Sequence, residues 1–121
     1  MARGSYLANG TYTWGANNNK LTVTSTYVLG KGRFTNFTDS TGENGNTLVK
    51  GDVATRYHVD NPTYGKALTC KANGYTRTMY KRDVGCMPDA VLDIWKTGVE
   101  CFGYTWNANL SINNAEYCYY R

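Results

Sequence analysis

Short strand-like segments separated by turn residues most constrain the fold of this chain. Runs rich in Thr, Tyr, Val and Leu recur between Gly, Asn and Asp residues, and helix signals are nearly absent. Asn73-Gly74 lies between two such runs and predicts a hairpin, because both of its residues tolerate positive φ. The pattern predicts strands at residues 6–14, 20–29, 33–37, 47–57, 67–71, 76–81, 91–94, 99–104 and 115–120.

Length and composition narrow the class of protein. The 121 residues suit one domain with a modest core, which we take as residues 1–121. Many short strands with regular turns favour a barrel or sandwich over a parallel α/β sheet. No apolar run approaches the roughly 20 residues that span a bilayer. The net charge of +4 includes no Lys/Arg block, so we predict neither a membrane span nor nucleic-acid binding.

Four cysteines, Cys70, Cys86, Cys101 and Cys118, lie in the second half of the chain. They contain no C-x-x-C pair, so we predict no metal site. Their even number, in a chain rich in Tyr, Asn, Thr and Gly, favours a secreted protein with two disulfides. Three pairings are open. We prefer Cys101–Cys118 with Cys70–Cys86, because strands at 100–105 and 116–120 could lie side by side. Four free thiols in a cytosolic chain is the alternative.

Three aspartates are the main candidate functional residues: Asp60, Asp83 and Asp93. Asp83 and Asp93 lie at strand-like, mostly apolar or turn positions, where a carboxylate is unusual. Asp93 has two apolar residues on each side, so a freely solvated position is hard to find for it. Partly buried carboxylates close to one another cannot all ionise cheaply, so one pKa rises and a general acid becomes available near neutral pH. We therefore predict Asp93 as an acid/base residue and Asp83 as its partner.

The second half also carries a run of motifs in a recognisable order. They are Asp60-Asn61-Pro62-Thr63-Tyr64-Gly65-Lys66-Ala67-Leu68, Gly74-Tyr75, Asp83-Val84-Gly85, Leu92-Asp93-Ile94-Trp95 and Phe102-Gly103. In order and approximate spacing they resemble the 3D (Asp-Asp-Asp) domain over residues 53–112. The segment is more distantly similar to RlpA, expansins, loosenins and barwin, which are double-psi β-barrels. The resemblance implies an all-β, six-stranded double-psi β-barrel, with extra N-terminal strands and at most one or two short helices.

The same resemblance implies a function. In 3D and MltA-type lytic transglycosylases one Asp protonates the glycosidic oxygen of peptidoglycan, and the muramic O6 then closes on C1 to give a 1,6-anhydro product. That Asp matches Asp93, its neighbouring carboxylate matches Asp83, and Asp60 matches a supporting third Asp. We expect a secreted enzyme that acts on cell-wall polysaccharide without a cofactor. The substrate-binding candidates are Asp60, two counterparts of RlpA-like groove residues and two aromatic residues: Asp60, Glu43, His58, Trp95 and Tyr75.

Each candidate also has a structural interpretation. Asp83 and Asp60 can serve turns through their side chains, and Asp93 can bind backbone N–H groups. His58 can be a solvated strand residue, and Glu43 a loop-tip residue. Residues 86–89 also depart from the family pattern, which usually has a second Gly there. Two other functions therefore stay open: a non-hydrolytic, expansin- or loosenin-like polysaccharide binder, and a secreted inhibitor of cysteine proteases.

Overall fold

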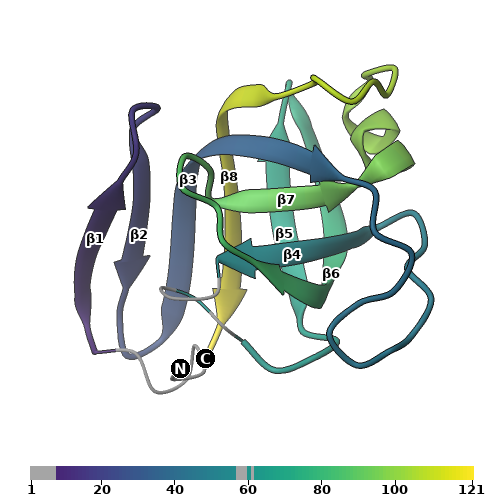
Figure 1. Cartoon of the computed structure of the whole chain (residues 1–121). Helices are drawn as coiled ribbons and strands as arrows, with labels where there is room; N and C mark the ends of the chain where they lie inside the picture. Colours follow the sequence, from purple (N-terminus) through teal and green to yellow (C-terminus); the bar gives the residue numbers. More distant parts are fainter. Residues whose placement is uncertain (1–7, 57–59, 61) are drawn as a thin grey trace.

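Eight strands form one sheet in a computed structural model of the chain, which describes residues 8–56, 60 and 62–121 (Figure 1). The strands are β1 (Gly10–Trp14), β2 (Asn19–Val23), β3 (Tyr27–Phe37), β4 (Asp52–Arg56), β5 (Ala67–Ala72), β6 (Tyr75–Gly85), β7 (Leu92–Trp95) and β8 (Ile112–Tyr120). Within the described residues, the short 3₁₀ helix η2 (Lys96–Phe102) follows β7 directly. No helix in this part of the chain is long and apolar enough to cross a membrane.

Six of the strands close into a barrel. Their order is β3-β7-β4-β6-β5-β8, and β8 pairs with β3 to complete the ring. The pairs β3–β7 and β4–β6 are parallel, and the other pairs in the ring are antiparallel. Closure leaves no unpaired edge within the ring. The fold class predicted from the sequence is confirmed. Six strands form the closed barrel, and the N-terminal strands β1 and β2 extend the sheet outside it (Figure 1).

β3 belongs to both parts of the sheet and differs from its prediction. The expected strand at 20–29 is interrupted by a turn, in which the Thr24 N–H donates to the Tyr27 carbonyl at 2.9 Å. β3 then continues through 33–37, with an irregularity in its pairing to β8 between Gly32 and Phe34. Its first half pairs with β2 and β8, and its second half pairs with β7. The irregularity lies where β3 passes from its pairing with β8 to its pairing with β7.

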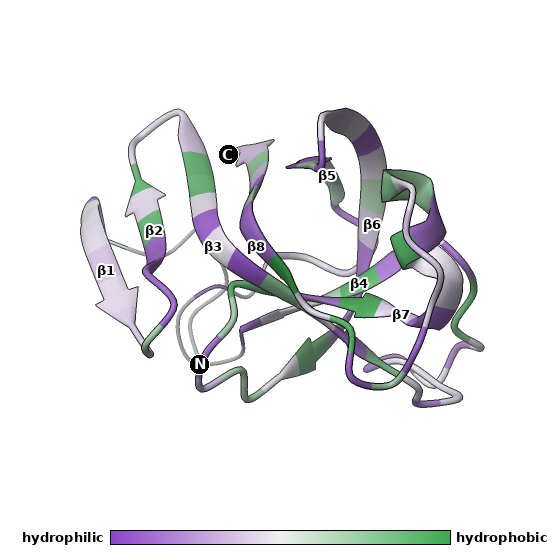
Figure 2. Cartoon of the chain, turned by 90° about the horizontal axis from the view of Figure 1, so that it is seen from above, coloured by the Kyte–Doolittle hydropathy of each residue, from purple (hydrophilic) through white to green (hydrophobic). Residues whose placement is uncertain are grey.

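The core fills the barrel with side chains that alternate along each strand. Figure 2 shows this alternation as hydrophobic and hydrophilic bands along β3 and β8. Fully buried side chains come from every strand of the ring and from η2: Val28, Phe34, Val53, Leu68, Met79, Leu92, Ile94, Tyr117 and Phe102. A second, smaller cluster of Ala54, Met87, Ala90 and Phe37 forms separately from this core. That second cluster lies beside the candidate site.

The second half of the chain contains one predicted hairpin and one predicted strand that the structure treats differently. The Asn73-Gly74 hairpin is confirmed, and these residues have φ of 50° and 79° between β5 and β6. The strand expected at 99–104 is wrong, because η2 occupies most of it and is followed by the capping residue Gly103, where φ is 84°. A Cβ at Gly98 would lie 2.6 Å from Ile94 Cγ2, so the absence of a side chain lets the helix pack tightly after β7.

The predicted disulfides are also absent: all four cysteines, which lie in the described part of the chain, are free thiols. Cys70 points into the barrel from β5 and is fully buried, whereas Cys118 alternates with the inward-pointing Tyr117 and Tyr119 and lies on the outer face of β8. Cys101 lies on η2 and not on a strand beside β8, so the geometry that favoured Cys101–Cys118 is not present.

Candidate active site

Four side chains form a row across the outer face of the barrel: Thr35, Asp93, Ala54 and Asp83. Thr35 on β3 is paired with Asp93 on β7, Asp93 with Ala54 on β4, and Ala54 with Asp83 on β6. Paired positions point to the same face of a sheet. Because Leu92 points into the core, its neighbour Asp93 points outward. The two predicted carboxylates therefore lie on one face, on either side of a small alanine.

A bulge in β6 puts Asp83 in this row. Val53 pairs with Lys81, but the next residue, Ala54, pairs with Asp83, so Arg82 is the extra residue on β6. A bulge of this kind re-aims the side chains that follow it. Without it, Arg82 would stand opposite Ala54. Burial raises the pKa of Asp83, as do the charges of Asp39 and Glu43, while the Val84 N–H opposes the shift.

Asp93 has the electrostatics of an acid/base group. Burial raises its pKa to about 6, and the negative charges of Asp39 and Asp83 act in the same direction. The Thr35 hydroxyl donates a hydrogen bond to Asp93 Oδ1 at 3.0 Å, which opposes the shift and fixes the orientation of the carboxyl group. At mildly acidic pH this side chain is therefore divided between its protonated and ionised forms.

A surface pocket of about 340 Å³ opens beside Asp93. Its other walls come from Arg33 and Thr35 on β3 and from the loop of residues 86–90. In this loop Met87 and Ala90 also pack with Ala54 in the small cluster. Asp83 does not line the pocket, so it influences Asp93 through its charge and from the far side of Ala54.

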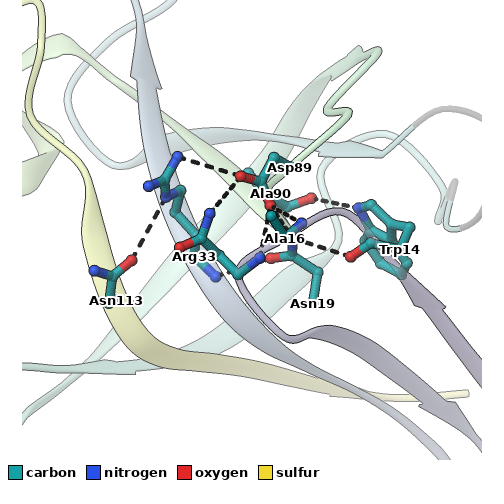
Figure 3. Close-up of polar contacts among 8 residues, drawn as sticks. Trp14, Ala16, Asn19, Arg33, Asp89, Ala90 and Asn113 are labelled. Atoms are coloured by element: carbon teal, nitrogen blue, oxygen red, sulfur yellow. Dashed lines mark hydrogen bonds and ion pairs between the residues drawn. The ribbon is translucent and has the colours of Figure 1, made fainter.

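The 86–90 loop is held by contacts that the sequence analysis missed (Figure 3). Asp89 accepts hydrogen bonds from the Ala16 N–H at 2.9 Å and from Asn19 Nδ2 at 2.9 Å, both in the β1–β2 hairpin. Trp14 Nε1 donates to the Ala90 carbonyl at 3.0 Å. Arg56 Nε donates to the Met87 carbonyl at 2.8 Å. The departure from the family pattern at 86–89 was the only signal in the sequence, and it did not identify these partners.

Asp60 lies elsewhere, among the buried residues of the barrel. It is 1% exposed and accepts hydrogen bonds from the Tyr117 and Tyr119 hydroxyls. Burial raises its pKa to about 6, although both hydroxyls and the charges of Lys81 and Arg121 lower it. Asp60 does not line the pocket beside Asp93. Its burial leaves no exposed surface for a substrate, and the supporting role that the resemblance implied stays a prediction.

The remaining described candidates do not line the pocket beside Asp93. Glu43 contacts the buried Lys81, and its backbone N–H donates to the Arg82 carbonyl at 3.1 Å. Trp95 shares the outward face of β7 with Asp93, and its indole N–H donates to the Asp39 carbonyl at 2.7 Å. Tyr75 stands at the β5–β6 hairpin with Arg77 over its ring, away from the pocket lining.

His58 lies outside the described residues. Among the residues that are described, no group of three or more His, Cys, Asp and Glu side chains is arranged to hold a metal ion.

Comparison with known proteins gives one informative similarity. The chain is 36% identical over 66 residues to the uncharacterized protein YdjM of Bacillus subtilis (strain 168), a match that covers 52% of this chain and 54% of the relative. The chain thus spans about half the length of the curated relative it matches. No protein-family model matches the chain. No solved structure matches it.

Proposed function

We propose that this protein cleaves a peptidoglycan-type polysaccharide, with Asp93 as the general acid and base. The observation that carries the proposal is a half-buried carboxyl group with a pKa of about 6 at the wall of a pocket. A general acid is most effective when its pKa lies near the working pH. The resemblance of residues 53–112 to the 3D domain supplies the substrate class and the reaction type.

In this mechanism protonated Asp93 donates its proton to the glycosidic oxygen, and the bond between that oxygen and C1 breaks. The Asp93 carboxylate then takes the proton of the sugar's own O6 hydroxyl, and O6 forms a bond to C1. The products are a shortened glycan and a 1,6-anhydro sugar, with no water consumed and Asp93 again protonated. The negative charges of Asp83 and Asp39 favour the protonated acid and stabilise the cationic character that develops at C1.

Secretion and the cell-wall location are part of this proposal. They rest on the resemblance and on the composition, because the cysteines are free and add no support from disulfides. A non-hydrolytic polysaccharide binder is the second candidate. Its support is the set of tyrosines that are at least two-fifths exposed, Tyr75, Tyr80 and Tyr120, which offer flat faces for sugar rings. Inhibition of cysteine proteases stays a prediction from the resemblance alone.

Digestion of purified peptidoglycan followed by mass spectrometry tests the proposal. We expect 1,6-anhydro products from the native protein and a loss of at least about 100-fold in their rate of formation for Asp93→Asn. Glu100→Gln is the matched control, because Glu100 is an exposed carboxylate paired with Lys50 away from the pocket. Undiminished product from Asp93→Asn would remove the role assigned to Asp93. Binding to insoluble glycan without released sugar would favour the second candidate.

A further inference from the structure

The β1–β2 hairpin, which lies outside the barrel and outside the family-like segment, contacts the loop that lines the pocket of Asp93. Its turn receives the carboxylate of Asp89 (Figure 3). Asp89 Oδ1 accepts from the Ala16 N–H at 2.9 Å, the Asn17 N–H at 3.0 Å and Asn19 Nδ2 at 2.9 Å. Asn17 Nδ2 donates to Oδ2 as well. Four N–H groups therefore surround one side chain from the opposite element.

The turn is shaped for this carboxylate. Gly15 has a φ of 73°, and a Cβ there would lie 2.5 Å from Asp89 Oδ1 and 2.9 Å from the Pro88 carbonyl oxygen. Asn19 is 1% exposed and also accepts a hydrogen bond from the Arg33 N–H at 3.0 Å, so it joins the turn, Asp89 and β3. The hydrogen bonds from Asn17, Ala16 and Asn19 outweigh partial desolvation and lower the pKa of Asp89. Asp89 is therefore ionised over the range in which Asp93 titrates.

A second contact lies beside the first. The Trp14 indole N–H donates to the Ala90 carbonyl at 3.0 Å, and the Arg56 guanidinium lies 4.7 Å from the Trp14 ring while it donates to the Met87 carbonyl. Both ends of the 86–90 loop are thus fixed by residues outside it. The same loop covers Ala54 and forms the wall of the pocket beside Asp93.

We propose that Asp89 is a positioning residue, which fastens the 86–90 loop to the β1–β2 turn. It thereby sets the shape of the pocket that Asp93 lines and limits the access of water to it. The consequence for the reaction rests on the proposed function. The consequence for Asp93 itself does not, because the titration of its carboxyl group can be measured without any substrate. The hairpin then has a role in the site, although it contributes no group that contacts the substrate.

The physical link is desolvation. Burial is the largest cause of the raised pKa of Asp93, so a loop that opens to water lowers this pKa toward its ordinary value. The neighbouring strand β4 presents the uncharged Ala54, and its Arg56 is engaged with Met87. The titratable and charged groups that face Asp93 from the other elements are Arg33 on β3, Asp39 after β3, Asp83 on β6, and Cys86 and Asp89 in the loop.

The test is a carboxyl ¹³C NMR titration of Asp93. Asp89→Ala removes the fastening, but it also removes a carboxylate and releases Arg33, its ion-pair partner at 3.5 Å, so this variant changes the charges of the pocket as well. Two variants in the hairpin separate the fastening from the lost charge, because neither of them removes a charged group. Gly15→Ala displaces Asp89 from its turn, and Asn17→Ala removes one donor and nothing from the loop. Glu100→Gln is the control for a lost surface carboxylate.

We expect the pKa of Asp93 to fall by about one pH unit in Asp89→Ala and Gly15→Ala, by less in Asn17→Ala, and not at all in Glu100→Gln. An unchanged pKa in folded Gly15→Ala and Asn17→Ala would overturn the proposal, even if Asp89→Ala shifts it by charge. If Asp89→Ala and Gly15→Ala fail to fold, the pKa of Asp93 in the milder variant Asn17→Ala tests the proposal. Should the protein have no glycan-cleaving activity, these shifts are still expected. In an active protein, the alkaline limb of the pH–rate profile should move with them.

Discussion

Asp83 and Asp93 are paired with the same residue, Ala54, from the two strands that flank β4. Ala54 has only a methyl group as its side chain, so no bulky group separates the two carboxylates. Asp83 accordingly raises the pKa of Asp93. Only Asp93 lines the pocket, so the arrangement gives the two groups different roles.

Asp83→Asn should lower the pKa of Asp93. The substitution removes one of the negative charges that disfavour ionisation of Asp93 while it keeps the shape of the side chain. We expect a decrease of about half a pH unit, read by carboxyl ¹³C NMR, because like charges a few ångströms apart near a surface interact weakly. The control is Glu116→Gln on β8, which is not among the groups that shift Asp93. An unchanged pKa of Asp93 would show that burial and the charge of Asp39 account for the raised pKa without Asp83.

Asp93→Asn should stabilise the protein above pH 6. The folded pKa of about 6 lies above the ordinary pKa of 3.8, so the stability linked to Asp93 is complete below pH 3.8 and is lost as the pH rises through 6. The amide cannot ionise and avoids this loss. We expect a gain of about 1–2 kcal/mol in the free energy of unfolding at pH 7.5 and almost none at pH 4. Urea titrations at both pH values measure it, and an equal effect at the two would contradict the assigned pKa.

Tyr119→Phe should destabilise the protein at neutral pH. It removes one of the two hydroxyls that donate to the buried Asp60, which is ionised above a pKa of about 6. A lost hydrogen bond to a buried charge costs about 1.5–3 kcal/mol. Tyr120→Phe is the matched control, because Tyr120 is 69% exposed and should change stability by less than about 0.5 kcal/mol. The cost for Tyr119→Phe should shrink below pH 4, where Asp60 is protonated.

The thiols should react in order of exposure. Without any reductant, the unfolded protein should give four thiols per chain with a disulfide-exchange reagent. In the native protein the exposed Cys86 should react first. Cys70 should react only on unfolding, because it is fully buried and its burial raises its pKa. Fewer than four thiols in urea would mean that disulfides form after all.

Local patterns predicted an all-β barrel or sandwich and indicated the acidic candidates, and the resemblance to the 3D domain implied the six-stranded barrel. Alternation of apolar and polar residues reports which face of a strand is buried, and Asn73-Gly74 needs only its own φ angles to form a turn. The same local reasoning explains why Asp93, between two core residues of β7, points out of the barrel. It failed at 99–104, where the fit of Gly98 against Ile94 favours a helix over the strand that the local residues suggested.

The tertiary structure alone decided which residues meet. Asp83 and Asp93 share Ala54 because β4 inserts between β6 and β7 and because a bulge shifts β6 by one residue. Asp89 meets a turn more than 70 residues earlier in the chain. Cys70 and Cys118 occupy opposite faces of neighbouring strands. Such contacts depend on strand order, register and closure of the whole barrel, which arise from packing between distant segments and leave no signal in the residues next to each site.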